Sequence, residues 1–269
     1  MFKENRVSII IPARNEKYLA KTVDDLLQKA TGDIEIIVIL DGYWPENTDY
    51  SSDSRVQYLH FNNSFSMRNN INSGALLATG DFLMKVDAHC MVGQGYDEIL
   101  KASCGNKTIV VPRRFALDAE NWKIEERTDN KYPIDYMILN ETLQGIPVKK
   151  DSELEVDELM TSQGSCWFMS KDYFNYLDLM DEDTYGTFWQ EMQEVGLKCW
   201  LSGGKMVVNK KTWYAHWHKT DGRGYSLPDG EKDRTRAVVN KWRDSTMFSK
   251  QIHGLDWLFE RFGVKQDGN

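Results

Sequence analysis

Residues 80–90 read GDFLMKVDAHC, a run that changes from apolar to polar part-way along. Phe82 to Val86 is short, apolar and rich in strand formers, which predicts a buried β-strand. Side chains i and i+2 of a strand share one face, so Asp87 and His89 would aim at one point beyond its carboxyl end. In open α/β sheets ligands bind at that edge.

A carboxylate beside an imidazole suits a borderline divalent ion such as Mn²⁺, or Mg²⁺, and two ligands would leave positions open for water or a diphosphate. A plainer interpretation is also open at this point. Asp87 would then cap the following turn, and His89 would be an ordinary turn histidine.

The first hundred residues alternate between strand and helix patterns. A nearly continuous β-branched run at 7–11 is typical of a central parallel strand buried on both faces. Leucine and valine at helical spacing follow it, and a second buried run at 34–40 stops at Asp41, which makes a β-α-β unit with an expected right-handed crossover. A strand at 56–61 and a helix at 66–78 continue the alternation. This pattern predicts an α/β fold with a Rossmann-like, mostly parallel sheet and helices on both faces.

We expect a single domain over residues 1–269. Its parts would be a nucleotide-binding half at 1–105, an acceptor and catalytic half at 106–250, and a C-terminal helix and tail at 251–269. Residues 115–157 are charged and aromatic with few clean periods, so we interpret them as a loop-and-hairpin region that carries acceptor specificity. The other expected elements are strands at 108–112, 165–169, 205–208 and 213–218, helices at 96–103, 171–177, 186–202, 231–245 and 255–262, and a closing loop at 219–230.

The composition is that of a soluble globular protein, with 41% hydrophobic and 28% charged residues. A formal net charge of −8 gives no electrostatic footprint for nucleic acid, although Arg113, Arg114, Lys149 and Lys150 would line a local basic groove. No apolar run approaches the roughly 18 residues of a membrane span, and no signal peptide precedes the first strand. The four cysteines are scattered, which favours free thiols in a reducing cytoplasm.

Two further sites carry acidic residues. Asp41 follows the second strand, where its carboxylate would accept from a pyrimidine base or from ribose hydroxyls, or would cap a turn. Glu191 and Glu194 are three apart and therefore share a helix face. They would orient sugar hydroxyls or supply a general base, or they would form a solvated acidic face.

Residues 213–218 read WYAHWH, and strand alternation places Tyr214, His216 and His218 on one face. One of the two histidines would complete a metal site with Asp87 and His89. Taken alone, a strand histidine is more often structural.

Three motifs now stand together: VSIIIPARNE at residues 7–16, DAHC at 87–90 and YSLP at 225–228. With them the chain resembles the A-type glycosyltransferases of family 2, and more closely the catalytic domain of the polypeptide N-acetylgalactosaminyltransferases of family 27. The corresponding family motifs are V-S-V-I-I-P-x-x-N-E, D-A-H-C and Y-T-F-P. The resemblance covers about residues 6–245.

Residues 188–194, FWQEMQE, align on the family's W-G-G-E-N-L-E, and His216 aligns on the histidine of G-H-V-F. The chain departs from the family where Phe188 replaces a tryptophan, Gln190 a glycine and Lys219 an arginine. The spacing from the aligned histidine to the YSLP motif is also one residue longer.

The resemblance implies a GT-A fold and a metal-dependent hexosyl- or pentosyltransferase that moves a sugar from a UDP-sugar to a hydroxyl acceptor with retention of configuration. It implies that Asp87, His89 and His216 hold Mn²⁺ (or Mg²⁺). The catalytic residues that it implies are Glu191, Asp87 and Arg68, of which Glu191 and Arg68 would fix the sugar hydroxyls. The donor-binding residues that it implies are Pro12, Ala13, Arg14, Glu16, Asp41, Arg68, Asp87, Ala88, Lys219, Arg223 and Tyr225. The last three of these would belong to a lid that closes over the donor and excludes water.

Several alternatives stay open. Glu191 would be the general base if the enzyme inverts configuration instead. The acceptor would be a protein, a saccharide or a hydroxymethylated base in DNA. A non-catalytic module that binds a nucleotide sugar or a carbohydrate is a further hypothesis, whereas a Rossmann dehydrogenase is disfavoured because no Gly-x-Gly-x-x-Gly follows the first strand.

Overall fold

A computed structural model describes residues 3–45, 51–127, 132–219, 222–244 and 246–265. The strands of its main sheet are β1 Lys3–Ala13, β2 Ile34–Asp41, β3 Val56–Phe61, β4 Gly80–Val86, β5 Cys90–Val92, β6 Thr108–Asp118, β7 Lys123–Ile124, β10 Val156–Glu158, β11 Cys166–Ser170 and β12 Lys205–His216. A separate hairpin pairs β8 Tyr136–Leu139 with β9 Gly145–Val148. The helices are α1 Leu19–Lys29, α2 Met67–Leu77, α3 Tyr96–Ala102, α4 Lys171–Tyr176, α5 Glu182–Tyr185, α6 Glu191–Leu201, α7 Glu231–Asn240 and α8 Leu255–Phe262, with a short 3₁₀ turn at Lys241–Arg243.

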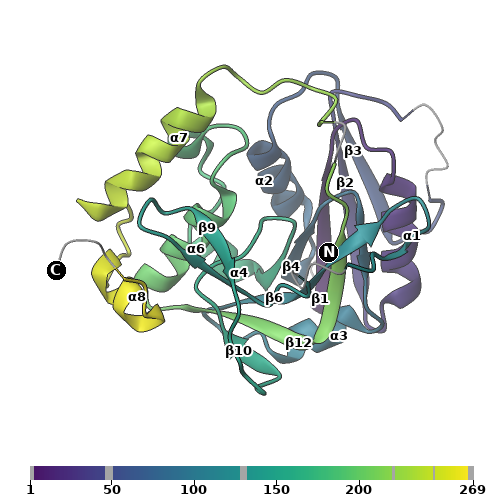
Figure 1. Cartoon of the computed structure of the whole chain (residues 1–269). Helices are drawn as coiled ribbons and strands as arrows, with labels where there is room; N and C mark the ends of the chain where they lie inside the picture. The colour runs from purple at the N-terminus through teal and green to yellow at the C-terminus, as the bar shows by residue number, and fades with distance from the viewer. Residues whose placement is uncertain (1–2, 46–50, 128–131, 220–221, 245, 266–269) are drawn as a thin grey trace.

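Within the described residues the main sheet has ten strands, in the order β10-β12-β6-β11-β4-β1-β2-β3, with β5 paired to β12 and β7 to β6 (Figure 1). Strands β3, β2, β1 and β4 are parallel, and β12 runs parallel to β6. Strand β11 lies antiparallel between β4 and β6 and so joins these two parallel groups. The predicted α/β fold with a mostly parallel sheet is confirmed.

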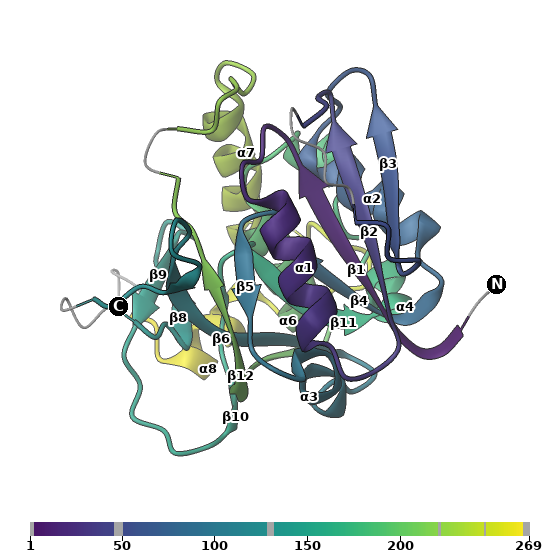
Figure 2. The same ribbon diagram turned by 90° about the vertical axis from the view of Figure 1, so that its right-hand side faces the viewer.

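Helices cover both faces of the sheet, and the apolar side chains of β1 divide between them. Ile9 and Ile11 pack in a buried cluster with side chains of α1 and α3, whereas Ile10 packs in a second cluster with side chains of α2 and α6. Figures 1 and 2 show α1 and α2 on opposite faces of β1 and β2. A Cβ added at Gly74 would lie 2.5 Å from Cγ2 of Ile10, so this glycine lets α2 approach the sheet closely.

Several predicted elements differ from the structure in their bounds. The strands expected at 205–208 and 213–218 are one strand, β12, which shifts register between Asn209 and Trp213 and ends at His216. The polar residues between them stay in the strand because its neighbours satisfy them; the Asn209 amide, for example, donates to the Ile99 carbonyl and the Ser103 hydroxyl.

The helix expected at 186–202 begins only at Glu191. Gly186 and Gln190 have φ angles of 71° and 64°, in the left-handed region, and an α-helix cannot pass through such residues. The turn they form places Glu191, the first residue of α6, beside Trp167 near the start of β11.

The expected loop-and-hairpin region at 115–157 contains the end of β6, the β8–β9 hairpin and the start of β10. Helices α7 and α8 follow β12, as the pattern at the C-terminal end predicts, with α7 ending at Asn240 instead of extending to 245. Across the described part of the chain, no helix combines the length and the hydropathy of a membrane span.

Candidate active site

A cavity of about 710 Å³ lies at the carboxyl ends of β1, β2 and β4. The segments that follow these strands form one wall, and the end of β12 with the segment after it forms another. The predicted site residues in these walls are Pro12, Ala13, Arg14, Glu16, Asp41, Asp87, Ala88, His89, His216, Lys219, Arg223 and Tyr225. Arg68 and Glu191 are predicted site residues that are not in the walls.

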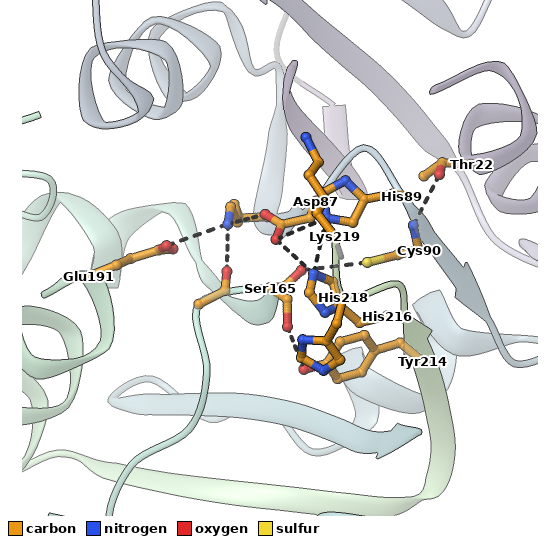
Figure 3. A network of polar contacts seen from close by, with 12 residues as sticks. Thr22, Asp87, His89, Cys90, Ser165, Glu191, Tyr214, His216, His218 and Lys219 are labelled. Atoms are coloured by element: carbon orange, nitrogen blue, oxygen red, sulfur yellow. Dashed lines mark hydrogen bonds and ion pairs between the residues drawn. The ribbon is translucent and has the colours of Figure 1, made fainter. Parts of the chain in front are cut away.

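Three predicted metal ligands converge in this cavity. His216 Nε2 lies 3.1 Å from His89 Nε2 and 3.2 Å from Asp87 Oδ2, and Asp87 Oδ2 lies 3.9 Å from His89 Nε2. Figure 3 shows the three side chains pointing toward one another. Their ligand atoms all lie within 4.8 Å of one another, which is close enough for one cation to contact all three.

The backbone explains how His216 reaches residues so far away in the sequence. It is opposite Cys90 in the antiparallel pair of β5 and β12, and the next amide, that of Trp217, donates to the His89 carbonyl at 3.1 Å. Strand pairing therefore places the third imidazole beside the first two ligands.

Buried contacts orient both imidazoles. Glu16 Oε2 lies 2.8 Å from His89 Nδ1, and because a carboxylate can only accept there, a proton sits on Nδ1 and Nε2 faces the other two predicted ligands. Burial lowers the pKa of His216 to about 3, more than the hydrogen bond to Asp87 raises it, so this imidazole is neutral. Two imidazole nitrogens and one carboxylate oxygen fit Mn²⁺ and leave further positions for other ligands.

Lys85 is a residue of this site that the sequence prediction missed. Its side chain is 1% exposed, and its ammonium lies 2.6 Å from Asp87 Oδ1 and 3.4 Å from Glu191 Oε2. Burial lowers the pKa of a lysine, but these two carboxylates outweigh it and raise the pKa of Lys85 above its usual value. Burial likewise raises the pKa of Asp87, but Lys85 and His216 outweigh it and hold that pKa well below its usual range.

Glu191 lies beside the cavity wall without forming part of it. Its Oε1 accepts from the Trp167 indole at 2.8 Å, and burial raises its pKa more than the Lys85 ammonium lowers it. A Cβ added at Gly164 would lie 2.2 Å from Oε2 of Glu191, so only a glycine at this position leaves room for the carboxylate.

Arg68 is fully buried and forms an ion pair with Glu194, which also accepts from Lys198 at 2.8 Å. Its guanidinium also donates to the Trp189 carbonyl at 2.9 Å. The interpretation of Glu191 and Glu194 as a solvated acidic face is therefore wrong, since they are 9% and 0% exposed. In this conformation Arg68 supports the turn before α6 and does not reach the cavity.

Asp41 is 3% exposed and lines the cavity. Its carboxylate accepts from the Ser64 hydroxyl and from the Phe65 amide, each at 2.8 Å. These bonds hold the loop before α2 against the end of β2, so the turn-capping interpretation of Asp41 is compatible with its place in the cavity wall.

Comparison with known proteins identifies the family. The family model described as Glycosyl transferase family 2 matches residues 8–177, well over half of the chain. The chain belongs to glycosyl transferase family 2. The expectation of a glycosyltransferase related to polypeptide N-acetylgalactosaminyltransferases is confirmed.

A curated relative of this glycosyltransferase is polypeptide N-acetylgalactosaminyltransferase 3 of Taeniopygia guttata. The two are 26% identical over 179 residues, which are 62% of this chain and 28% of the relative. The matched region thus covers less than a third of the length of that protein.

Two solved structures share the fold. The crystal structure of GalNAc-T7 with UDP, GalNAc and Mn²⁺ superposes with a TM-score of 0.76 at 20% identity, over 89% of this chain and 49% of that chain. The crystal structure of S. aureus TarS superposes with a TM-score of 0.60 at 12% identity, over 90% and 40%. Both likenesses support the predicted GT-A fold.

In this glycosyltransferase the segment after β12 lies against the end of β1. Lys219 Nζ lies 2.7 Å from Glu16 Oε1, Asn15 donates to the Gly224 carbonyl at 2.8 Å, and the Arg14 guanidinium stands 4.2 Å from the centre of the Tyr225 ring. The residues at the end of β1 therefore contact those that the family resemblance assigns to a lid.

His218 lies beyond the end of β12, so the predicted strand alternation does not reach it. It still lines the cavity, and its Nε2 lies 2.9 Å from the Tyr132 hydroxyl. Of the two histidines in WYAHWH, the structure brings His216 to the metal-ligand group.

Proposed function

We propose that this glycosyltransferase transfers a sugar from a UDP-sugar to a hydroxyl group of an acceptor and that it needs a divalent ion such as Mn²⁺. The observation that carries the proposal is the meeting of Asp87, His89 and His216 inside the cavity at the strand ends. The GalNAc-T7 structure holds UDP, GalNAc and Mn²⁺, which supports both the donor and the ion.

A divalent ion bound by these three residues would neutralise charge on the departing diphosphate. The chain supplies further groups around that position. Asp41 lies at the end of β2, where its carboxylate would orient the uridine. Arg14, Lys219, Arg223 and Tyr225 would surround the diphosphate and exclude water, which is a competing acceptor.

We propose that the transfer proceeds with retention, because every carboxylate in the cavity walls already has a partner. Glu16 contacts Lys219 and His89, Asp41 contacts Ser64 and Phe65, and Asp87 contacts Lys85 and His216. Glu191, the candidate base for inversion, is held behind the wall by Trp167 and Lys85. Among the described residues, none of these carboxylates stands free to deprotonate an acceptor hydroxyl.

We propose a protein or a saccharide as the acceptor ahead of a hydroxymethylated base in DNA. The basic groove considered from the sequence has much of its charge neutralised, since Arg113 pairs with Asp135 at 2.7 Å and Lys150 with Asp157 at 2.7 Å. Arg114 is only 5% exposed. Such a groove offers few free cations to a phosphate backbone.

The experiment that tests the proposal is a screen of UDP-sugars for Mn²⁺-dependent hydrolysis, because hydrolysis needs no acceptor. We expect one donor to release UDP only when the ion is present. The Asp87→Ala and His216→Ala variants should lose at least about 99% of this activity, since each removes a ligand. Their circular dichroism should match that of the unmodified chain.

Undiminished turnover in either folded variant would remove the metal assignment. UDP binding that depends on Mn²⁺, without turnover of any donor or acceptor, would favour the non-catalytic binding module instead.

A further inference from the structure

Lys85 is an internal cation whose ammonium is fully engaged. Its three acceptors are Asp87 Oδ1, the Gly164 carbonyl and Glu191 Oε2. An ammonium has three N–H donors, so each one has a partner. The side chain comes from β4 and is 1% exposed, so water does not compete for these contacts.

This contact divides the two oxygens of Asp87 between two tasks. Oδ1 faces Lys85, and Oδ2 faces the imidazole of His216. Asp87 therefore presents one oxygen to the proposed ion. A carboxylate free of Lys85 would be able to present both oxygens.

The same contact sets the charge of the metal site. Lys85 pairs with Asp87 and Lys219 pairs with Glu16, and an imidazole brings no negative charge to an ion. Here the ligand atoms come with almost no net negative charge.

We propose that Lys85 is a positioning residue that keeps the metal site close to neutral, so that the divalent ion is held firmly only together with a nucleotide diphosphate. The diphosphate then supplies the negative charge that the protein ligands lack. This inference rests on the proposed function, because it takes the ion and the nucleotide as its ligands.

The test is a titration with Mn²⁺ in which electron paramagnetic resonance measures the free ion, with and without UDP. In the unmodified chain, UDP should tighten Mn²⁺ binding about 100-fold or more. In Lys85→Met, Mn²⁺ alone should bind about tenfold or more tightly than in the unmodified chain, because one positive charge next to a ligand is gone. The enhancement by UDP should shrink accordingly.

Two further variants keep the test decisive if Lys85→Met folds poorly. The double variant Lys85→Met with Glu191→Gln removes the carboxylate that would lose its buried partner, and it should also bind Mn²⁺ alone more tightly. Lys85→Arg keeps the positive charge and should bind Mn²⁺ alone as weakly as the unmodified chain. Thermal unfolding selects the folded variants.

A lysine that only supports the fold would give the opposite result, because a disturbed site binds Mn²⁺ more weakly when Lys85 is replaced. Weaker or unchanged Mn²⁺ binding in the folded Lys85→Met and double variants overturns the inference, and so does equally tight binding with and without UDP in the unmodified chain. If the unmodified chain binds neither UDP nor Mn²⁺, the proposed function itself fails. Failure of the inference alone would leave Mn²⁺-dependent turnover of the donor intact.

Discussion

Glu16 is a single side chain that serves two parts of the cavity. One oxygen lies 2.8 Å from Nδ1 of His89, a proposed metal ligand, and the other lies 2.7 Å from the Lys219 ammonium. Its side chain is 8% exposed, so water competes little for either contact. Glu16 therefore orients the His89 ring and also holds Lys219, the third residue after β12.

The Glu16→Gln variant should bind Mn²⁺ about 10-fold to 100-fold more weakly in the presence of UDP, since a carboxylate behind a metal-bound histidine orients the ring and raises its basicity. The amide has a single acceptor oxygen and cannot serve both partners. Mn²⁺ titration measures the change. The control is Glu120→Gln, the same substitution at an exposed carboxylate that pairs with Lys17, and it should leave Mn²⁺ affinity unchanged. Equal affinities in the two variants would show that Glu16 plays no part in holding the ion.

At the scale of elements, Asp157 links the short edge strand β10 to the β8–β9 hairpin. Asp157 accepts from the Tyr136 hydroxyl of β8 at 2.8 Å and pairs with Lys150 at 2.7 Å. Burial raises the pKa of Asp157, but hydrogen bonds from Lys150, Ser152 and Tyr136 outweigh it and lower the pKa to about 2.

This lowered pKa makes the connection sensitive to acid. The pKa in the folded state lies below the value of about 3.9 in the unfolded state, so the stabilisation is present above roughly pH 4 and is lost as the pH falls toward 2. Asp157→Asn should lower the melting temperature at pH 6 and should reduce its fall between pH 6 and pH 3. Thermal unfolding at both pH values measures this. Asp151→Asn, at a nearby exposed position, is the control, and an identical pH response in both variants would contradict the assignment.

At the scale of the whole molecule, the cavity depends on both parallel groups of strands. Asp87 and His89 follow β4, whereas His216 ends β12, and β11 and β6 lie between these two strands in the sheet. The proposed ligands come together only when the sheet has formed across this junction. A ligand that bridges them must therefore stabilise the entire fold.

UDP with Mn²⁺ should accordingly raise the melting temperature of the whole chain in a single transition. At a ligand concentration of 100 times its Kd the gain is about 2.7 kcal/mol. For a chain of this size each kcal/mol corresponds to roughly 2–4 °C. Differential scanning calorimetry measures the shift, which should vanish in His216→Ala. It should persist in the control His253→Ala, because the His253 ring stacks on Trp257 and does not line the cavity. A shift that survives in His216→Ala would place the ligand elsewhere.

Sequence patterns over a few residues predict those parts of the site that lie within a few residues of one another. The Asp87 and His89 pair follows from alternation at the end of a buried strand, and the mostly parallel sheet follows from the strand and helix order. His216 required the family motif as well, because nothing in alternation alone distinguishes it from His218. What separates the two residues is that β12 ends at His216.

Other features depend on contacts that the sequence pattern does not reveal. Lys85 stands inside an apolar run, and the strand pattern alone assigns it no role in the site. Its position two residues before Asp87, on the same strand face, is the sequence feature that would have indicated its contact with Asp87. The late start of α6 depends on the left-handed backbone of Gln190, a residue type with no strong preference for it. Arg68 and Glu191 were assigned by family motif, and their position behind the cavity wall depends on packing around Trp167 and Glu194.

The pairing of β5 with β12 has a consequence for which sequence changes the site tolerates. His89 and His216 are 127 positions apart in the sequence. The pairing of His216 with Cys90, the residue after His89, nevertheless fixes where the chain returns beside His89. The β8–β9 hairpin lies within this span but outside the main sheet, so its length and sequence can change without moving these rungs. The three proposed ligands would then stay together while that hairpin varies.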